Sequence, residues 1–264
     1  MQRRQFLAAS LATSAIALTR EGEAQARPVA PREYYQIRRY QMRQGPEPKL
    51  AESYIGDALI PALTRMGFGP IGAFQEDIGP ETPAYIVLIP GNSAEALAQL
   101  SLRLAQDPLF LKAADPFWNA PASAPAYERV ETLLLLAFEG WPRLTPPPST
   151  ATKSKRIFQL RTYESPSEQA HERKVEMFNS GEFECFKTAG FHPVFFGDTL
   201  IGTRMPSLTY MLSLPSVDEL NAHWDAFRGD PGWKKLSTNP RYSYEPLVSN
   251  ITNLILSPLA ASQI

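Results

Sequence analysis

Short segments in which apolar and polar residues alternate recur along the chain and predict β-strands, because successive side chains of a strand point to opposite faces. The clearest are residues 34–40, which contain YQIRRY, and residues 157–164, which contain FQLRTY. A longer stretch with helical spacing follows each of them, at 48–66 and 168–189, and ends at a glycine. The pattern therefore predicts a strand followed by a helix at the start of each half.

Two more strands, a second helix and a last strand are predicted in each half. The expected strands are 70–76, 84–89 and 129–138 in the first half and 193–197, 207–214 and 249–256 in the second. Ser93 and Ser216 precede acidic residues and are predicted to be the N-caps of the second helices. The resulting order, βαββαβ, is that of a ferredoxin-like unit.

The two halves form an internal repeat. A constant offset of 123 residues relates three pairs of segments: 35–40 with 158–163, 67–70 with 190–193, and 107–112 with 230–235. Both helices of a ferredoxin-like unit cover one face of its sheet, so the other face needs a cover, which a second unit supplies. We therefore expect an α+β protein in which two tandem ferredoxin-like units form a pseudo-dimeric α/β barrel. The expected boundaries are 27–140 for the first repeat, 141–155 for a proline-rich linker and 156–264 for the second repeat.

Motifs of the second half carry a resemblance to a known family. They are FQLRTYE at 158–164, the Gly190-Phe191 turn, and Trp224-x-x-Phe227 ahead of Asp230-Pro231-x-Trp233. These motifs resemble the NIPSNAP family of the dimeric α/β-barrel superfamily, closely over 157–256 and more loosely over 34–138. The resemblance implies a soluble barrel. Its superfamily neighbours include cofactor-free monooxygenases, haem peroxidases and stress-response modules, so it does not select one chemistry.

The N-terminus is typical of an export signal. Two arginines precede an apolar stretch at 6–18, which is too short to span a bilayer as a helix, and AQA at 24–26 fits a cleavage site. The sequence RRQFL resembles the twin-arginine export motif, with an ordinary Sec signal as the alternative. We therefore expect residues 1–26 to be a Tat-like signal peptide, cleaved near Ala26, and the mature protein to be periplasmic or secreted.

Composition limits the classes of partner. The chain has 264 residues, with 26 Lys and Arg against 27 Asp and Glu and a formal net charge of −1. No basic excess is available to bind a polyanion, so a nucleic-acid partner is not expected. The single cysteine excludes an intramolecular disulfide framework. We expect a small-molecule ligand and no stable membrane insertion after signal cleavage; a homo-oligomer is compatible with the fold.

The repeated Q-x-R-x-Y pattern is the candidate ligand site. The alternate strand face is mostly apolar, so we expect that face to pack on the helices and the polar face to line the barrel interior. The predicted interior set is Gln36, Arg38, Tyr40, Gln159, Arg161 and Tyr163. Buried guanidinium groups need partners, and a ligand carboxylate suits the planar donors of arginine. The alternative is that Arg38 and Arg161 pair with internal acids such as Glu164 or Glu131 and only fix how the halves dock.

The candidate catalytic residues are His192, Tyr163 and Arg161. His192 starts a predicted strand. It would enter the interior if it shared a face with Val194 and Phe196, and could then serve as a general base or haem ligand. The alternative is a histidine in a turn.

The remaining candidates favour structural roles. His171 is expected at the surface and His223 partly exposed on a helix. No two histidines have the i, i+4 spacing of a helical metal pair, so neither a metal nor a cofactor is predicted. We expect packing roles for Trp224, Phe227 and Trp233 and a buried, inert thiol at Cys185.

Two hypotheses for the function follow. The first is a small-molecule binding or accessory protein that uses a polar cavity between the two sheets. The second is a cofactor-independent oxygenase-like or isomerase-like enzyme acting on a small anionic or aromatic metabolite, and haem binding is a weaker third. No complete set of acid, base and nucleophile is recognisable in the sequence, so binding comes first.

Overall fold

The computed structural model describes residues 31–264, and the predicted signal peptide, residues 1–26, lies outside the described residues. The first repeat comprises β1 (Tyr34–Gln41), α1 (Glu47–Ser53), the π-helix η1 (Tyr54–Leu59), α2 (Ile60–Arg65), β2 (Gly72–Ile78), β3 (Ala84–Gly91), α3 (Ala94–Ala98), α4 (Leu100–Leu104), α5 (Pro108–Trp118) and β4 (Arg129–Ala137). The connecting segment contains α6 (Ser149–Thr152). The second repeat comprises β5 (Ile157–Glu164), α7 (Glu168–Met177), the π-helix η2 (Phe178–Glu182), α8 (Phe183–Thr188), β6 (His192–Ile201), β7 (Ser207–Leu214), α9 (Leu220–Gly229), α10 (Pro231–Ser237), the 3-10 helix η3 (Pro240–Tyr242), α11 (Tyr244–Leu247) and β8 (Asn250–Pro258).

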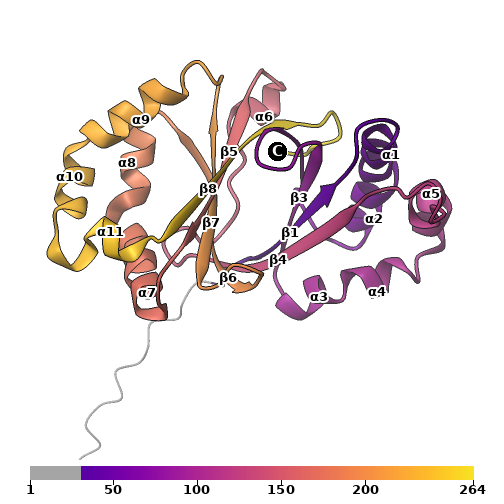
Figure 1. The fold of residues 1–264 in the computed structure, drawn as a ribbon, viewed down its shortest axis with the longest axis horizontal. Helices are drawn as coiled ribbons and strands as arrows, with labels where there is room; N and C mark the ends of the chain where they lie inside the picture. The colour runs from indigo at the N-terminus through magenta and orange to yellow at the C-terminus, as the bar shows by residue number, and fades with distance from the viewer. Residues whose placement is uncertain (1–30) are drawn as a thin grey trace, which may run out of the picture.

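The strands close into an antiparallel barrel in the order β1-β3-β2-β8-β5-β7-β6-β4. Each repeat contributes a four-stranded sheet, and the pairs β2–β8 and β4–β6 join the two sheets. The helices of the two repeats lie on opposite sides of the barrel (Figure 1). This arrangement confirms the predicted fold class. Among residues 31–264, no helix has the length and apolar character needed to cross a membrane.

Local sequence signals explain where the second helices begin. The Ser93 hydroxyl accepts a hydrogen bond from the Ala96 amide at 3.2 Å, so the predicted cap of α3 is confirmed. The prediction for Ser216 is wrong, because residues 218–219 form a turn and α9 begins at Leu220. The repeated Asp-Pro motifs are also caps: Asp107 caps α5 and Asp230 caps α10, each with proline in the first helical turn.

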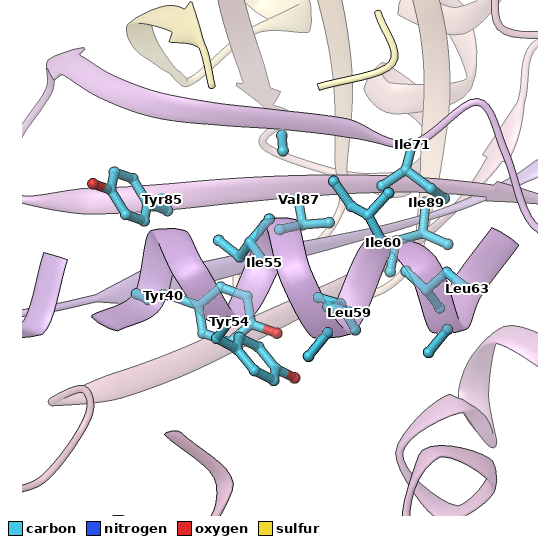
Figure 2. Packing of buried hydrophobic residues seen from close by; sticks show 14 of the residues in the cluster. Tyr40, Tyr54, Ile55, Leu59, Ile60, Leu63, Ile71, Tyr85, Val87 and Ile89 are labelled. Carbon is cyan, nitrogen blue, oxygen red and sulfur yellow. The ribbon is translucent and has the colours of Figure 1, made fainter. Parts of the chain in front are cut away.

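Apolar helix faces cover the outside of each sheet. In the first repeat, Ile55 and Leu59 of η1 pack with Val87 and Ile89 of β3. Figure 2 shows these side chains between helix and sheet, with Tyr40 of β1 also directed toward the helix. An equivalent cluster, rich in aromatic rings, fills the helix layer of the second repeat.

The barrel interior has its own apolar cluster, separate from the two helix layers. Its members include Tyr35 and Ile37 of β1 and Phe158 and Leu160 of β5. An eight-stranded barrel is only just wide enough for side chains to fill it, so these residues plug the end where β1 and β5 begin. Ile264 is fully buried in the same cluster.

A buried ion pair lies in the helix layer of the second repeat. The Lys174 ammonium donates to a Glu182 carboxylate oxygen at 2.7 Å, and the two side chains are 0% and 2% exposed. At the offset of 123, the matching residues of the first repeat are Ala51 and Leu59, both fully buried. The second repeat therefore has an ion pair at a position of its helix layer where the first repeat has two apolar side chains.

This correspondence gives a direct test of what the pair contributes. Lys174→Ala leaves a buried carboxylate without its charged partner and should lower the free energy of unfolding by about 3–5 kcal/mol. The double variant Lys174→Ala/Glu182→Leu copies the first repeat and should recover to within about 1 kcal/mol of the natural protein. Urea denaturation measures both. If the double variant is as unstable as the single one, the apolar pair of the first repeat is not equivalent to the ion pair of the second.

Candidate functional site

A cavity of about 510 Å³ lies inside the barrel at the end where β1 and β5 finish. The antiparallel pairings make β1, β2, β5 and β6 run in the same direction, so the β2–β3 and β6–β7 turns meet at this end. Both turns line the cavity, through Pro80 and Glu81 and through Thr203 and Arg204. The cavity is therefore the part of the interior that the plug of apolar and aromatic side chains does not fill.

The floor of the cavity is apolar. It is formed by Ile37, Ile86, Leu133, Leu160 and Leu254. The strand register places Leu133 opposite Ile37 and Leu254 opposite Leu160, so the two sheets contribute matching residues. A ligand that reaches this depth needs an apolar body.

One wall of the cavity carries a buried ion pair. Arg39 of β1 faces the interior, and its Nε donates to Glu76 of β2 at 3.0 Å and its Nη2 at 2.9 Å. The Glu76 side chain is 0% exposed, and that of Arg39 is 14% exposed. Arg39 also donates to the Glu81 carboxylate at 2.7 Å and to the Glu81 carbonyl at 3.1 Å. Internal carboxylates thus occupy most donors of this guanidinium.

The opposite wall carries hydroxyl groups. The Oγ1 atoms of Thr162 and Thr209 lie 2.9 Å apart, and Arg204 donates to Thr252 Oγ1 at 3.1 Å. In β5, Thr162 pairs with Thr209 of β7 and Thr252 of β8. The three threonines therefore form one continuous inward-facing patch, which we call the threonine layer.

The charged wall and the threonine layer occupy equivalent positions in the two repeats. Arg39 corresponds to Thr162 and Glu76 to Thr199 at the offset of 123, and Thr199 is also buried. The registers agree, because Glu131 lies opposite Arg39 and Thr252 lies opposite Thr162. Divergence of the repeats has thus made the cavity asymmetric.

The rim of the cavity is charged, balanced and accessible to solvent. The side chains of Glu81, Arg129, Glu131 and Arg204 are 40%, 50%, 42% and 55% exposed. Arg129 contacts Glu81 at 3.1 Å and Glu131 at 3.5 Å. The hydrogen bond from Arg39 lowers the pKa of Glu81 below its usual value, so this carboxylate is ionised at neutral pH.

The predicted orientation of the Q-x-R-x-Y residues is wrong. Gln36, Arg38, Tyr40, Gln159, Arg161 and Tyr163 face the helix layers, and the cavity is lined by other residues. The narrow interior takes the alternate, mainly apolar set, whereas long polar side chains fit between sheet and helices. Gln36, for example, donates to the Leu97 carbonyl of α3 at 2.8 Å and accepts from Arg38 at 2.6 Å.

The second-repeat members of this set form a polar cluster under the helices. The Arg161 guanidinium carbon lies 4.2 Å from the ring centre of Trp224, whose indole N–H donates to Gln159 at 2.9 Å. The hydroxyls of Tyr163 and Tyr210 are 2.8 Å apart. Burial raises the pKa of Tyr163 well above its usual value, so this phenol stays neutral. Glu131 and Glu164, proposed as partners for Arg38 and Arg161, lie within ion-pair distance of Arg39 and Arg204.

The histidines lie away from the cavity. His192 is exposed at the start of β6, the opposite end of that strand from the cavity. A bulge after Pro193 turns Val194 and Phe195 inward and Phe196 toward the helices, so the predicted shared face of His192, Val194 and Phe196 does not exist. The prediction that His171 lies at the surface is wrong: it is buried, with Nε2 2.7 Å from an Asp198 carboxylate oxygen. His223 is partly exposed on α9, as predicted.

The remaining predictions concern packing and metals. Trp224, Phe227 and Trp233 pack with the aromatic cluster of the second repeat, and Cys185 is buried, as expected. Desolvation by burial raises the pKa of Cys185 to about 12, which keeps the thiol protonated. Within residues 31–264, no group of three or more His, Cys, Asp or Glu is arranged to hold a metal ion.

One feature of the sequence does indicate where the cavity lies. Arg39 interrupts the otherwise apolar alternate face of the first repeat, and Thr162 takes its place in the second. A polar residue at the same strand position in both repeats marks the layer where the apolar filling stops. Neither Glu76 nor the other two residues of the threonine layer, Thr209 and Thr252, give a comparable local signal.

The NIPSNAP family model matches residues 158–263, which cover β5 to β8 and the connections between them. The second repeat thus matches the NIPSNAP family. The resemblance expected from FQLRTYE is thereby confirmed for this half of the barrel. A comparison with curated proteins finds no match.

Solved structures share the fold of the whole barrel. A candidate monooxygenase of Fusobacterium nucleatum matches with a TM-score of 0.56 and 8% identity, over 86% of this chain and 93% of the other. A candidate monooxygenase of Lactobacillus acidophilus matches with a TM-score of 0.56 and 10% identity, over 88% and 97% of the two chains. An anthrone oxidase-like protein matches with a TM-score of 0.51 and 12% identity, over 86% and 91%. At these identities the likeness establishes the fold alone.

The revised position of Arg161 changes the expected effect of removing it. Arg161→Leu should lower the free energy of unfolding by about 1–2 kcal/mol, because the contact with Trp224 is lost. The same variant should leave the affinity of the cavity for a neutral bicyclic probe, 2-acetylnaphthalene, unchanged. Urea denaturation and calorimetric titration test the two parts, with Arg38→Leu as the matched variant in the first repeat. Loss of probe binding at full stability would restore Arg161 as a ligand residue.

Proposed function

We propose that the protein binds a small, mainly apolar organic molecule in the cavity at the open end of the barrel. The observation that carries the proposal is the cavity itself: about 510 Å³ with an apolar floor, a few polar groups on its walls and a solvent-exposed charged rim. Sites for small molecules are typically cavities of about 300–1,000 Å³ with this mixture of lining residues.

The lining favours binding over turnover as the primary role. The lining residues include no histidine, lysine, cysteine or tyrosine within the described part of the chain. The carboxylates of Glu81 and Glu131 lie against arginines, so neither is placed as a free general base. Enzymatic activity is the second candidate function. Its support is the fold shared with two candidate monooxygenases and an anthrone oxidase-like protein.

Filling the cavity tests this function. Thr252→Trp places an indole in the threonine layer and should weaken the binding of 2-acetylnaphthalene by about tenfold or more, or about 1.4 kcal/mol. Asn253→Trp is the matched control, because Asn253 is the next residue of β8 and is exposed on the opposite face of the strand. Equal affinity in the two folded variants, checked by thermal denaturation, would place the probe outside the cavity and overturn the proposal.

We further propose that the protein acts outside the cytoplasm after removal of residues 1–26. The support is the sequence alone: two arginines, an apolar stretch and the AQA site. Mass spectrometry of protein recovered from the periplasm of its bacterial expression host should give the mass of residues 27–264. Recovery of the full-length mass from the cytoplasm would contradict this proposal. Replacing both arginines by lysine should retain the protein in the cytoplasm if the route is Tat, and should leave export intact if it is Sec.

A further inference from the structure

The threonine layer offers hydroxyl protons to the cavity. The Thr162 and Thr209 hydroxyls carry two protons between them, and their mutual hydrogen bond uses one. Thr252 accepts from Arg204, so its own proton is directed elsewhere. The backbone carbonyls of these strands are engaged in the ladders that β5 forms with β7 and β8. The remaining hydroxyl protons are therefore placed to meet an acceptor atom of a bound molecule.

The positive charge in the cavity is already neutralised. A ligand carboxylate at Arg39 would have to displace Glu76 or Glu81, which hold the Nε, Nη1 and Nη2 donors. Displacing Glu76 would strand a fully buried carboxylate, because that side chain has no access to water. Arg39 thus fixes the wall of the cavity and does not present a vacant donor fork.

Every arginine at the cavity lies against a carboxylate. Three arginines line the cavity, and all three are paired: Arg39 with Glu76 and Glu81, Arg129 with Glu81 and Glu131, and Arg204 with Glu164. An anion that enters loses its hydration and meets no surplus of positive charge, so its transfer is unfavourable. A cation meets paired carboxylates and is equally disfavoured. A neutral molecule pays neither cost.

We propose that the cavity selects neutral carbonyl compounds, in which a ketone-type oxygen accepts from the threonine layer and an apolar ring system rests on the Ile37 and Leu160 floor. This inference rests on the proposed binding function and narrows its ligand class. It excludes the anionic ligands that a vacant arginine would attract. The discriminating groups are the hydroxyls of Thr162, Thr209 and Thr252, all contributed by the second repeat.

Three probes of similar shape test the selection by calorimetric titration of the mature chain. They are 2-acetylnaphthalene, which is a neutral ketone, 2-ethylnaphthalene, which lacks the oxygen, and 2-naphthoate, which is an anion. The ketone should bind about threefold to tenfold more tightly than the hydrocarbon, as one hydrogen bond allows, and the carboxylate should bind most weakly. The folded Thr252→Trp variant reports any binding outside the cavity.

The variant Thr162→Val/Thr209→Val/Thr252→Val removes the hydroxyls while keeping the shape of the side chains. It should bind the ketone and the hydrocarbon equally, with the affinity for the hydrocarbon within about twofold of the natural protein. Thermal denaturation checks that the variant is folded. If 2-naphthoate binds best, or if the preference for the ketone survives in the variant, the inference is overturned and the binding function stands. If no probe binds the natural protein, the binding function fails and the inference fails with it.

Discussion

The width of an eight-stranded barrel is the constraint on which the rest of this structure depends. The interior holds about one set of inward-facing side chains, so the size of each such residue decides whether a level of the barrel is solid or hollow. At one end, Tyr35, Phe158 and their neighbours form a fully buried cluster. At the other, threonines on one sheet leave room opposite Arg39. The cavity is thus a consequence of short polar side chains where aromatic ones would have closed the barrel.

The two repeats share a backbone plan but place a buried ion pair on opposite faces of their sheets. The first repeat holds Arg39–Glu76 inside the barrel, where the second has threonines. The second holds Lys174–Glu182 under its helices, where the first has alanine and leucine. A buried ion pair adds little net stability compared with well-packed apolar residues, but it fixes the geometry of the groups around it. In the first repeat the surroundings include the cavity, so divergence there bears on the proposed ligand binding, whereas divergence under the helices bears on packing.

The sequence was sufficient to predict the architecture, because the alternating strands and the helix-ending glycines are local signals, and the 123-residue repeat shows the same order of elements twice. It was not sufficient to predict the site. Strand alternation separates Gln36, Arg38 and Tyr40 from Tyr35 and Ile37 without saying which set faces inward, since a closed barrel buries both faces. Apolar residues usually face the core of a protein, but each sheet here has an apolar core on both faces, one inside the barrel and one under the helices. The rule therefore allows either set of residues to face inward. The width of the barrel decides between them, and that width depends on all eight strands.

The face to which each residue points also separates the residues that hold the helices from those that line the cavity, within the same strand. Along β5, Phe158 closes the barrel, Leu160 forms the floor of the cavity and Thr162 supplies a hydroxyl to its wall, while Gln159, Arg161 and Tyr163 between them anchor the helices. Substitution at the cavity end can therefore change the lining of the cavity without disturbing the plug or the helix layers. The lining of such a barrel can thus change through one layer of side chains while the fold is kept, which is consistent with the fold that this chain shares with its structural neighbours at 8–12% identity.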